Sequence, residues 1–287
     1  MTISADTQIT DLTVNDHACL TFGEPEELFD LTAAFVRDGL DGGLKVVWLS
    51  DATPDRATAE LARRGVDVEP ALASGQLTAV GCEDRLVTGQ VFSASQAMSW
   101  LNREVEACAG QGLRLAVDMS WALRPVTGVE QLPEFEERLA AAVAGTTVSV
   151  LCQYDRERFD PVTLASVAAF HTRSVAAATY HNDVMLRICR QYAPPGIRLA
   201  GELDYQASES LALALTEALR LDGDVTVNMA ALAFIDVTCS RMILHAARGL
   251  PAPRRMILRC RPGLAARFVL LGAAGIPGLS LVSVDDR

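Results

Sequence analysis

The strongest constraint on the fold is an alternation of short apolar runs with longer segments of helical periodicity between residues 17 and 171. Alternation of this kind predicts a mostly parallel sheet with helices on both faces. The predicted strands cover residues 17–22, 45–50, 77–81, 113–119 and 147–155, and the predicted helices cover 25–40, 54–65, 94–110, 132–145 and 160–171. The amino-terminal part of the chain is therefore expected to be an α/β domain.

A double proline, Pro194 and Pro195, precedes a second and shorter alternating series. Because consecutive prolines stiffen the chain and exclude helix, we place a domain boundary near Ala193. The two expected domains then cover residues 10–192 and 194–287. The second series predicts strands at 196–204, 225–229, 255–260 and 279–284 and helices at 207–220, 240–248 and 263–275, which make a smaller α/β domain.

Composition and charge exclude several functional classes. The longest apolar runs are far shorter than the roughly 20 residues that cross a bilayer, and residues 1–10 lack a charged and apolar signal region. We therefore expect a cytoplasmic protein without a membrane partner. The net charge of −11 comes from the part before residue 193, which carries −12 and would repel nucleic acid. The seven cysteines are scattered without a CxxC pair, which predicts neither a disulfide framework nor a zinc knuckle.

Three segments of the second domain carry a family resemblance. The sequences GIRLAGELDYQ, VTVNMAALAFIDVTCSRMIL and RPGLAARFVLLGAAGI, in this order, resemble the signatures of the STAS domain, the fold of bacterial anti-sigma-factor antagonists. The resemblance implies that a hydroxyl residue after the FID strand is phosphorylated by a kinase that is also the anti-sigma factor. On this sequence the acceptor falls on Thr238, and the two acids of the phosphorylation pocket fall on Asp204 and Asp236.

The physical chemistry of this junction supports a switch and also an alternative. A phosphate on Thr238 would lie near free backbone N–H groups and the positive end of the helix dipole, and Asp236 would orient the hydroxyl. The family pattern is altered, however, at Val237, Cys239 and Ser240. Ser240 is a weaker candidate acceptor. In the alternative, Thr238 or Ser240 only caps the helix, and the loop docks a partner without being phosphorylated.

The first domain carries a second resemblance. Residues 17–22, 45–70, 113–121 and 151–160 are similar to the MEDS sensory domain of bacterial and archaeal regulators. That family shares its layout with RecA-type ATPases, and its mark is a His-x-Cys-x-x-aromatic motif, here His17, Cys19 and Phe22. The resemblance implies a RecA-like sheet and makes these three residues candidates for sensing an unidentified small molecule.

A phosphate-binding loop is missing from the first domain. An ATPase of this layout needs GxxxxGK[ST] after its first strand, whereas this chain has GEPEE, whose acids would repel a triphosphate. Asp118 resembles the magnesium-side acid of such enzymes but has no loop to work with. We therefore expect no enzymatic activity and no cofactor, with a degenerate nucleotide-binding enzyme as the less favoured alternative.

The His-x-Cys pair allows three interpretations. His17 and Cys19 are two residues apart on a strand and point to the same face, on which Cys152 and Asp155 would converge. The pair would begin a metal site, or a thiol beside an imidazole would sense an electrophile. In the third interpretation Cys19 is a buried apolar residue and His17 a hydrogen-bonded strand end. Because no further ligand is visible in the sequence, we expect no metal.

Together these features predict a regulator in which a sensory domain is fused to an anti-sigma-antagonist-like domain. It would act by switching protein partners in transcriptional control, with an anti-sigma factor or serine/threonine kinase as partner. The alternatives are a STAS scaffold that is not phosphorylated and a small-molecule sensor without an effect on a sigma factor.

Overall fold

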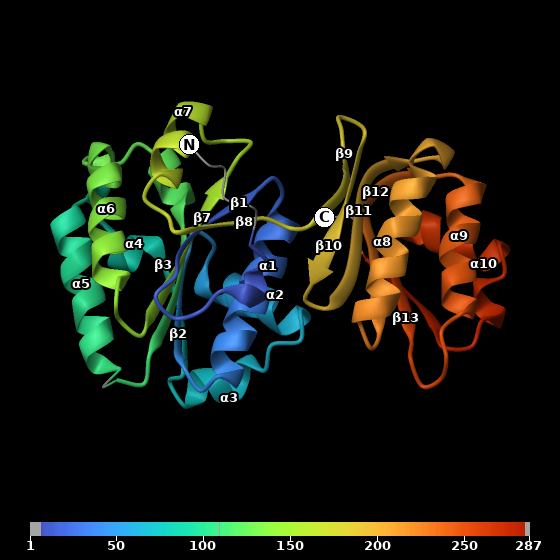
Figure 1. The fold of residues 1–287 in the computed structure, drawn as a ribbon, viewed down its shortest axis with the longest axis horizontal. Helices are drawn as coiled ribbons and strands as arrows, with labels where there is room; N and C mark the ends of the chain where they lie inside the picture. The colour runs from blue at the N-terminus through green and yellow to red at the C-terminus, as the bar shows by residue number, and fades with distance from the viewer. Residues whose placement is uncertain (1–6, 109, 285–287) are drawn as a thin grey trace. The chain divides into compact units, whose positions relative to one another are not determined.

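The computed structural model describes residues 7–108 and 110–284, which form two compact units (Figure 1). The first unit ends at Ala176 and the second begins at Ala177. Each unit contains a six-stranded sheet flanked by helices, which confirms the predicted α/β class. None of the helices in the described ranges is long and apolar enough to cross a membrane.

The sheet of the first unit is parallel throughout and has the strand order β3-β2-β6-β7-β1-β8. Helices α5 and α6 cover one face, and α1 and α2 cover the other, as Figure 1 shows. The strands are β1 (His17–Phe22), β2 (Lys45–Ser50), β3 (Leu77–Gly81), β6 (Leu113–Asp118), β7 (Val148–Asp155) and β8 (Arg173–Val175), and the short pair β4 (Val87–Thr88) and β5 (Val91–Phe92) lies outside this sheet. The helices are η1 (Ile9–Asp11), α1 (Pro25–Asp41), α2 (Pro54–Arg63), α3 (Val68–Ala73), α4 (Cys82–Arg85), α5 (Ala94–Ala107), η2 (Met119–Leu123), η3 (Val129–Gln131), α6 (Leu132–Val143) and α7 (Pro161–Ala168).

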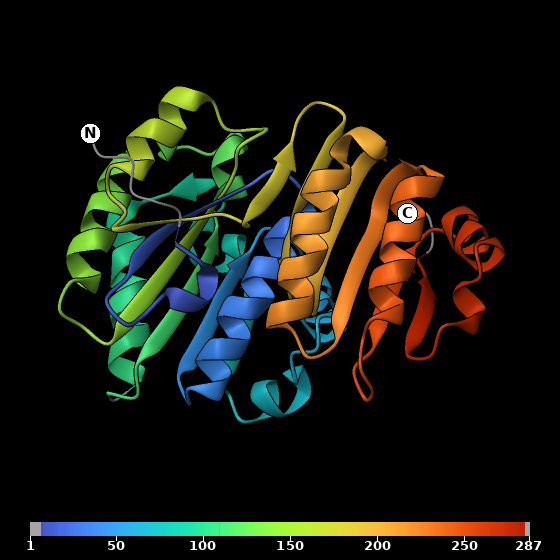
Figure 2. The same cartoon turned by 45° about the vertical axis from the view of Figure 1, so that its right-hand side comes forward.

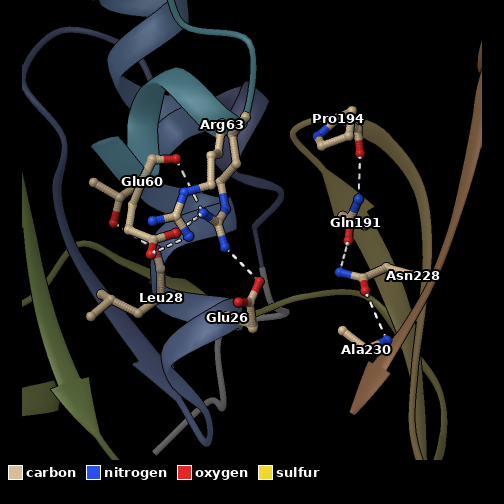
Figure 3. Close-up of polar contacts among 10 residues, drawn as sticks. Glu26, Leu28, Glu60, Arg63, Gln191, Pro194, Asn228 and Ala230 are labelled. Atoms are coloured by element: carbon tan, nitrogen blue, oxygen red, sulfur yellow. Dashed lines mark hydrogen bonds and ion pairs between the residues drawn. The ribbon is translucent and has the colours of Figure 1, made fainter. Parts of the chain in front are cut away.

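Local chemistry explains where these helices begin. Thr53, Ser93 and Asp160 each accept a hydrogen bond from a backbone N–H of the first turn of α2, α5 and α7. Between α1 and α2, the buried guanidinium of Arg64 contacts Glu26 and Glu60, both at 2.6 Å. The two acids are labelled in Figure 3. These contacts hold the two helices together on their face of the sheet.

The second unit has the sheet order β14-β13-β12-β11-β10-β9. Strands β11 to β14 are parallel, whereas β9, β10 and β11 pair antiparallel. Helices α8 and α9 contact each other over one face of this sheet (Figure 2). The elements are β9 (Thr179–Asn182), β10 (Leu186–Tyr192), β11 (Pro195–Leu203), η4 (Tyr205–Ala207), α8 (Ser208–Leu221), β12 (Val225–Ile235), α9 (Val237–Arg248), β13 (Met256–Cys260), α10 (Pro262–Leu270), η5 (Ala273–Gly275) and β14 (Leu279–Ser283).

The double proline does not mark the domain boundary that we expected near Ala193. Ala193 and Pro194 instead form the turn of a hairpin, in which β10 pairs with β11 along its whole length. Gln191 donates to Pro194 O and accepts from the Asn228 side chain on β12, each at 2.8 Å (Figure 3). These bonds hold the hairpin in the second sheet, so the division lies at Ala176 and Ala177.

Candidate functional site

A buried polar cluster lies between the sheet of the first unit and helix α6. His17 begins β1, Cys152 lies in β7, Glu136 lies on α6, and His171 follows α7. The donor atoms of these four residues, called here the His17 cluster, lie within 4.8 Å of one another. The side chains of His17, Glu136 and His171 are at most 1% exposed, and Cys152 is fully buried.

Glu136 is at the centre of the cluster. One carboxylate oxygen, Oε2, lies 3.1 Å from His17 Nε2 and 3.4 Å from His171 Nε2. The Cys152 Sγ atom lies 3.5 Å from His17 Nε2 and 3.6 Å from the same Glu136 oxygen. The other oxygen, Oε1, accepts a short hydrogen bond from the Tyr154 hydroxyl. Two imidazoles, a thiol and a phenol thus surround a single carboxylate.

The environment fixes the charge state of the cluster. Burial would raise the pKa of Glu136, but its close contact with His17, the nearby His171 and the Tyr154 hydroxyl together lower it. The carboxylate is therefore ionised at neutral pH. Burial, opposed by the charge of Glu136, lowers the pKa of His171 to about 4. Burial and then Glu136 raise the pKa of the Cys152 thiol well above its usual range.

The structure places only part of the predicted motif at this cluster. Cys19 lies beside Cys152 in the register of β1 and β7 and on the face of His17. Burial and then Glu136 raise the pKa of Cys19 to about 12, so it is not a reactive thiol at neutral pH. Phe22 lies an odd number of residues from His17 and therefore points to the opposite face, as does its register partner Asp155. The predicted convergence of Asp155 on this face is therefore wrong.

Sequence reasoning missed Glu136, His171 and Tyr154. A signal for Glu136 was present, because it lies on the face of α6 that carries the buried residues Leu132, Phe135, Leu139 and Val143. An acid on such a face needs a partner of opposite charge or a hydrogen-bond donor. No comparable signal marked His171. It lies after α7, and only the path that the chain takes beyond this helix brings it to the cluster.

The second candidate site is the junction between β12 and α9. Asp236 caps α9, since its carboxylate accepts from Cys239 N at 2.7 Å. Ser240 is fully buried, and its hydroxyl donates to Asp236 O at 2.7 Å. Thr238 is exposed in the first turn. The expectation that Thr238 or Ser240 caps the helix is therefore wrong, and burial removes Ser240 as an accessible acceptor.

The two predicted pocket acids differ in position. Asp204 caps the short helix η4, and its carbonyl accepts from the Cys239 thiol at 3.2 Å. The Asp204 side chain lines a hollow of about 370 Å³ next to the hairpin of β9 and β10. Thr238 lines another hollow, of about 570 Å³, between α8 and α9, together with Arg241 and His245. Asp204 thus lines a different hollow from the predicted acceptor, while Asp236 is two residues from it.

Side chains of the protein fill the turn after β1, where an ATPase of this layout would carry its phosphate loop. The Glu27 carboxylate is buried and accepts from Gly23 N at 3.0 Å. A Cβ added to Gly23 would lie 2.4 Å from the Arg156 guanidinium. Asp118, at the end of β6, accepts from Ser120 N at 3.0 Å and caps helix η2.

The first unit is thus an α/β domain with a parallel sheet and a buried polar cluster. Residues 16–172 match the sequence model of the MEDS family, the methanogen/methylotroph, DcmR sensory domain. The match covers more than half of the chain, which therefore belongs to this family. This membership assigns a sensory role to the first unit.

The comparison with curated proteins gives no match. Among solved structures, the chain is similar to a KaiC-like protein from Pyrococcus horikoshii OT3, with 13% identity, a TM-score of 0.47, and coverage of 65% of this chain and 79% of the other. It is also similar to the flagellar accessory protein FlaH from Methanocaldococcus jannaschii, with 12% identity, a TM-score of 0.46, and coverage of 64% and 83%.

Proposed function

We propose that this chain is a signalling regulator in which the MEDS sensory domain controls a phosphorylatable domain that resembles anti-sigma-factor antagonists. The second domain docks on an anti-sigma factor or a serine/threonine kinase, and phosphorylation of Thr238 weakens that docking. A small molecule bound by the first unit changes the affinity of the second for its partner. The proposal combines the sensory family with the resemblance of residues 194–287 to STAS domains.

The position of Thr238 carries this proposal. It is the second residue of α9, close after strand β12, and its side chain faces solvent. No hydrogen bond engages its hydroxyl within the described ranges of the chain. A kinase can therefore reach this hydroxyl without unfolding the helix.

The surroundings of Thr238 suit an added phosphate. The helix dipole places partial positive charge at the first turn, and Arg241 lies one turn further along the same hollow. A phosphate adds a charge of about −1.5 to −2 at this point. Asp236 lies beside the acceptor, so its carboxylate would repel the new phosphate and increase the difference between the two states.

A docking domain that is not phosphorylated is the second candidate function. Two apolar side chains at the junction of β12 and α9, Phe234 and Val237, are 42% and 51% exposed. Exposed apolar residues at a loop favour contact with a protein partner whether or not Thr238 is modified. This alternative has the same partner class but lacks the switch.

We propose ligand binding rather than nucleotide hydrolysis for the first unit. The Glu27 carboxylate accepts the Gly23 N–H in the turn where an ATPase would bind phosphate. A second negative group at this position would meet like charge, because Glu24 and Glu26 are in the same turn. Binding of ATP at micromolar concentration would contradict this part of the proposal.

The phosphorylation is tested with the serine/threonine kinases of the native cytosol and intact-mass measurement of the full chain. We expect one added phosphate on the parent protein and none on Thr238→Ala. Thr216→Ala is the matched control, because Thr216 lines the same hollow from α8. An unmodified parent protein that still captures an anti-sigma factor would favour the docking alternative.

A further inference from the structure

The protonation of the two histidines in the His17 cluster follows from their outer contacts. His17 Nδ1 lies 3.2 Å from Phe170 O, and His171 Nδ1 lies 2.8 Å from Val167 O. A carbonyl oxygen only accepts, so both Nδ1 atoms carry the proton. In the neutral imidazoles, both Nε2 atoms therefore present a lone pair, and both point toward Glu136 Oε2.

The two Nε2 lone pairs and the Glu136 carboxylate oxygen therefore face one another, with too few protons to form hydrogen bonds between them. A proton on His17 Nε2 would pair that ring with Glu136. That proton would leave His171 Nε2, which is buried and has no hydrogen-bond partner among residues 7–108 and 110–284, directed at the same carboxylate oxygen. Leaving a buried acceptor unpaired is unfavourable. One metal cation would use both lone pairs and the carboxylate at once.

The distances agree with one tetrahedral ion. Bonds of about 2.0 Å to nitrogen or oxygen and about 2.3 Å to sulfur place neighbouring donor atoms of such a site about 3.3–3.6 Å apart. The four distances described above are 3.1 and 3.4 Å from nitrogen to oxygen, 3.5 Å from nitrogen to sulfur, and 3.6 Å from oxygen to sulfur. Four of the six donor pairs thus have nearly the separations of an occupied site, and all four donor atoms lie within 4.8 Å of one another.

We propose that the first unit binds one Zn²⁺ ion through His17 Nε2, His171 Nε2, Glu136 Oε2 and Cys152 Sγ. Imidazole and thiolate donors disfavour Mg²⁺ and Ca²⁺, and a closed tetrahedron of nitrogen, oxygen and sulfur is a zinc geometry. On binding, the thiol proton of Cys152 passes to solvent and the sulfur binds as the thiolate.

Further contacts around the cluster are those that metal ligands usually make. Each ligating imidazole donates its other N–H to a backbone carbonyl, and the Tyr154 hydroxyl donates to the free oxygen of Glu136. Four protein ligands leave no position for a substrate, so the ion is structural. It joins β1, β7, α6 and the segment after α7. This site is independent of Thr238 and of the proposed partner switch.

The test uses the full chain, purified after growth with added zinc and analysed for metal by mass spectrometry. We expect about one Zn²⁺ per chain for the parent protein. Glu136→Gln keeps the size of the side chain but removes its charge, and it is expected to lower the zinc content at least tenfold. Two matched controls, Cys82→Ala for a buried thiol of the same unit and His181→Gln for a histidine of the second unit, are expected to keep full occupancy.

A second measurement does not depend on the folding of any variant. Co²⁺ is titrated into the parent chain after removal of metal with a chelator, and we expect saturation at one equivalent with tetrahedral ligand-field bands and a thiolate-to-cobalt charge-transfer band. Less than about 0.1 Zn²⁺ per folded chain, together with no cobalt spectrum, would overturn the proposal. Occupancy that Glu136→Gln leaves unchanged would overturn it as well.

Discussion

Replacement of Asp236 by Ala tests whether this acid is the cap of α9. Its carboxylate accepts the Cys239 N–H at 2.7 Å and is the side-chain cap of that helix. Loss of such a cap costs about 1 kcal/mol, within a range of about 0.5–2 kcal/mol. Asn is an equally good cap, so Asp236→Asn is expected to lose less stability than Asp236→Ala, namely only the favourable charge at the helix dipole, about 0.3–1 kcal/mol. Thr238→Ala, a change at an exposed site, is expected to stay within about 0.5 kcal/mol of the parent.

Urea unfolding separates the two units, because Trp48, Trp100 and Trp121 all lie in the first. Tryptophan fluorescence therefore reports the first unit, and circular dichroism reports both. With a slope of about 1–3 kcal/mol per molar urea, a loss of about 1 kcal/mol lowers the midpoint of the second unit by about 0.3–1 M. The fluorescence midpoint is expected to stay unchanged.

Two results would refute this reasoning. If Asp236→Ala had the same dichroism midpoint as Thr238→Ala, the hydrogen bond to Cys239 N would not stabilise the helix. If Asp236→Asn lost as much stability as Asp236→Ala, the charge of the carboxylate, and not its hydrogen bond, would account for the effect. The Asn variant also separates the cap from the proposed role in phosphorylation, because it keeps the fold and removes the charge next to Thr238.

Two further predictions concern the second unit and the thiols. Gly201→Ala should destabilise the second unit by at least about 1–3 kcal/mol, since Gly201 has a φ of +97° and an added Cβ would lie 2.0 Å from Met185 O. Gly223→Ala is the control, because Gly223 has open space around it. Equal thermal midpoints for the two variants would contradict the prediction. Alkylation with iodoacetamide should modify Cys108 well before Cys239, because burial and then Asp236 raise the pKa of Cys239 to about 12 and leave about one thiolate in ten thousand at pH 8. Peptide mass analysis that found Cys239 modified first would refute that order.

Periodicity predicted the elements well where each run of sequence has one consistent environment. Strands β1, β2 and β3 have the predicted bounds, and α1, α5 and α6 begin at the predicted residues. The apolar residues of each of these elements recur at regular spacing, so the local sequence already shows which face is buried in the fold. Strands β9 and β10 were missed, because β9 is short, β10 carries Arg187 and Arg190 among apolar residues, and the double proline that follows β10 also suits a linker.

The candidate sites were predicted unequally for a related reason. Asp236 and Thr238 are neighbours in the sequence, so the strand-to-helix junction could be located from local residues. The His17 cluster joins residues separated by as many as 154 positions in the chain, from His17 to His171. The sequence predicted that His17 and Cys19 share a face, but not which side chains face them across the sheet.

The sequence by itself determined the α/β class, the order of most strands and helices and the family of the first unit, because each depends on local pattern. Only the tertiary structure decided that the double proline lies at a hairpin turn, that Asp236 and not Thr238 caps α9, and that Glu136 and His171 meet at His17. Each of these depends on contacts between segments far apart in the chain, or on which of several nearby side chains reaches one backbone N–H. These contacts are set by the packing of the folded chain, which a local sequence pattern does not reveal.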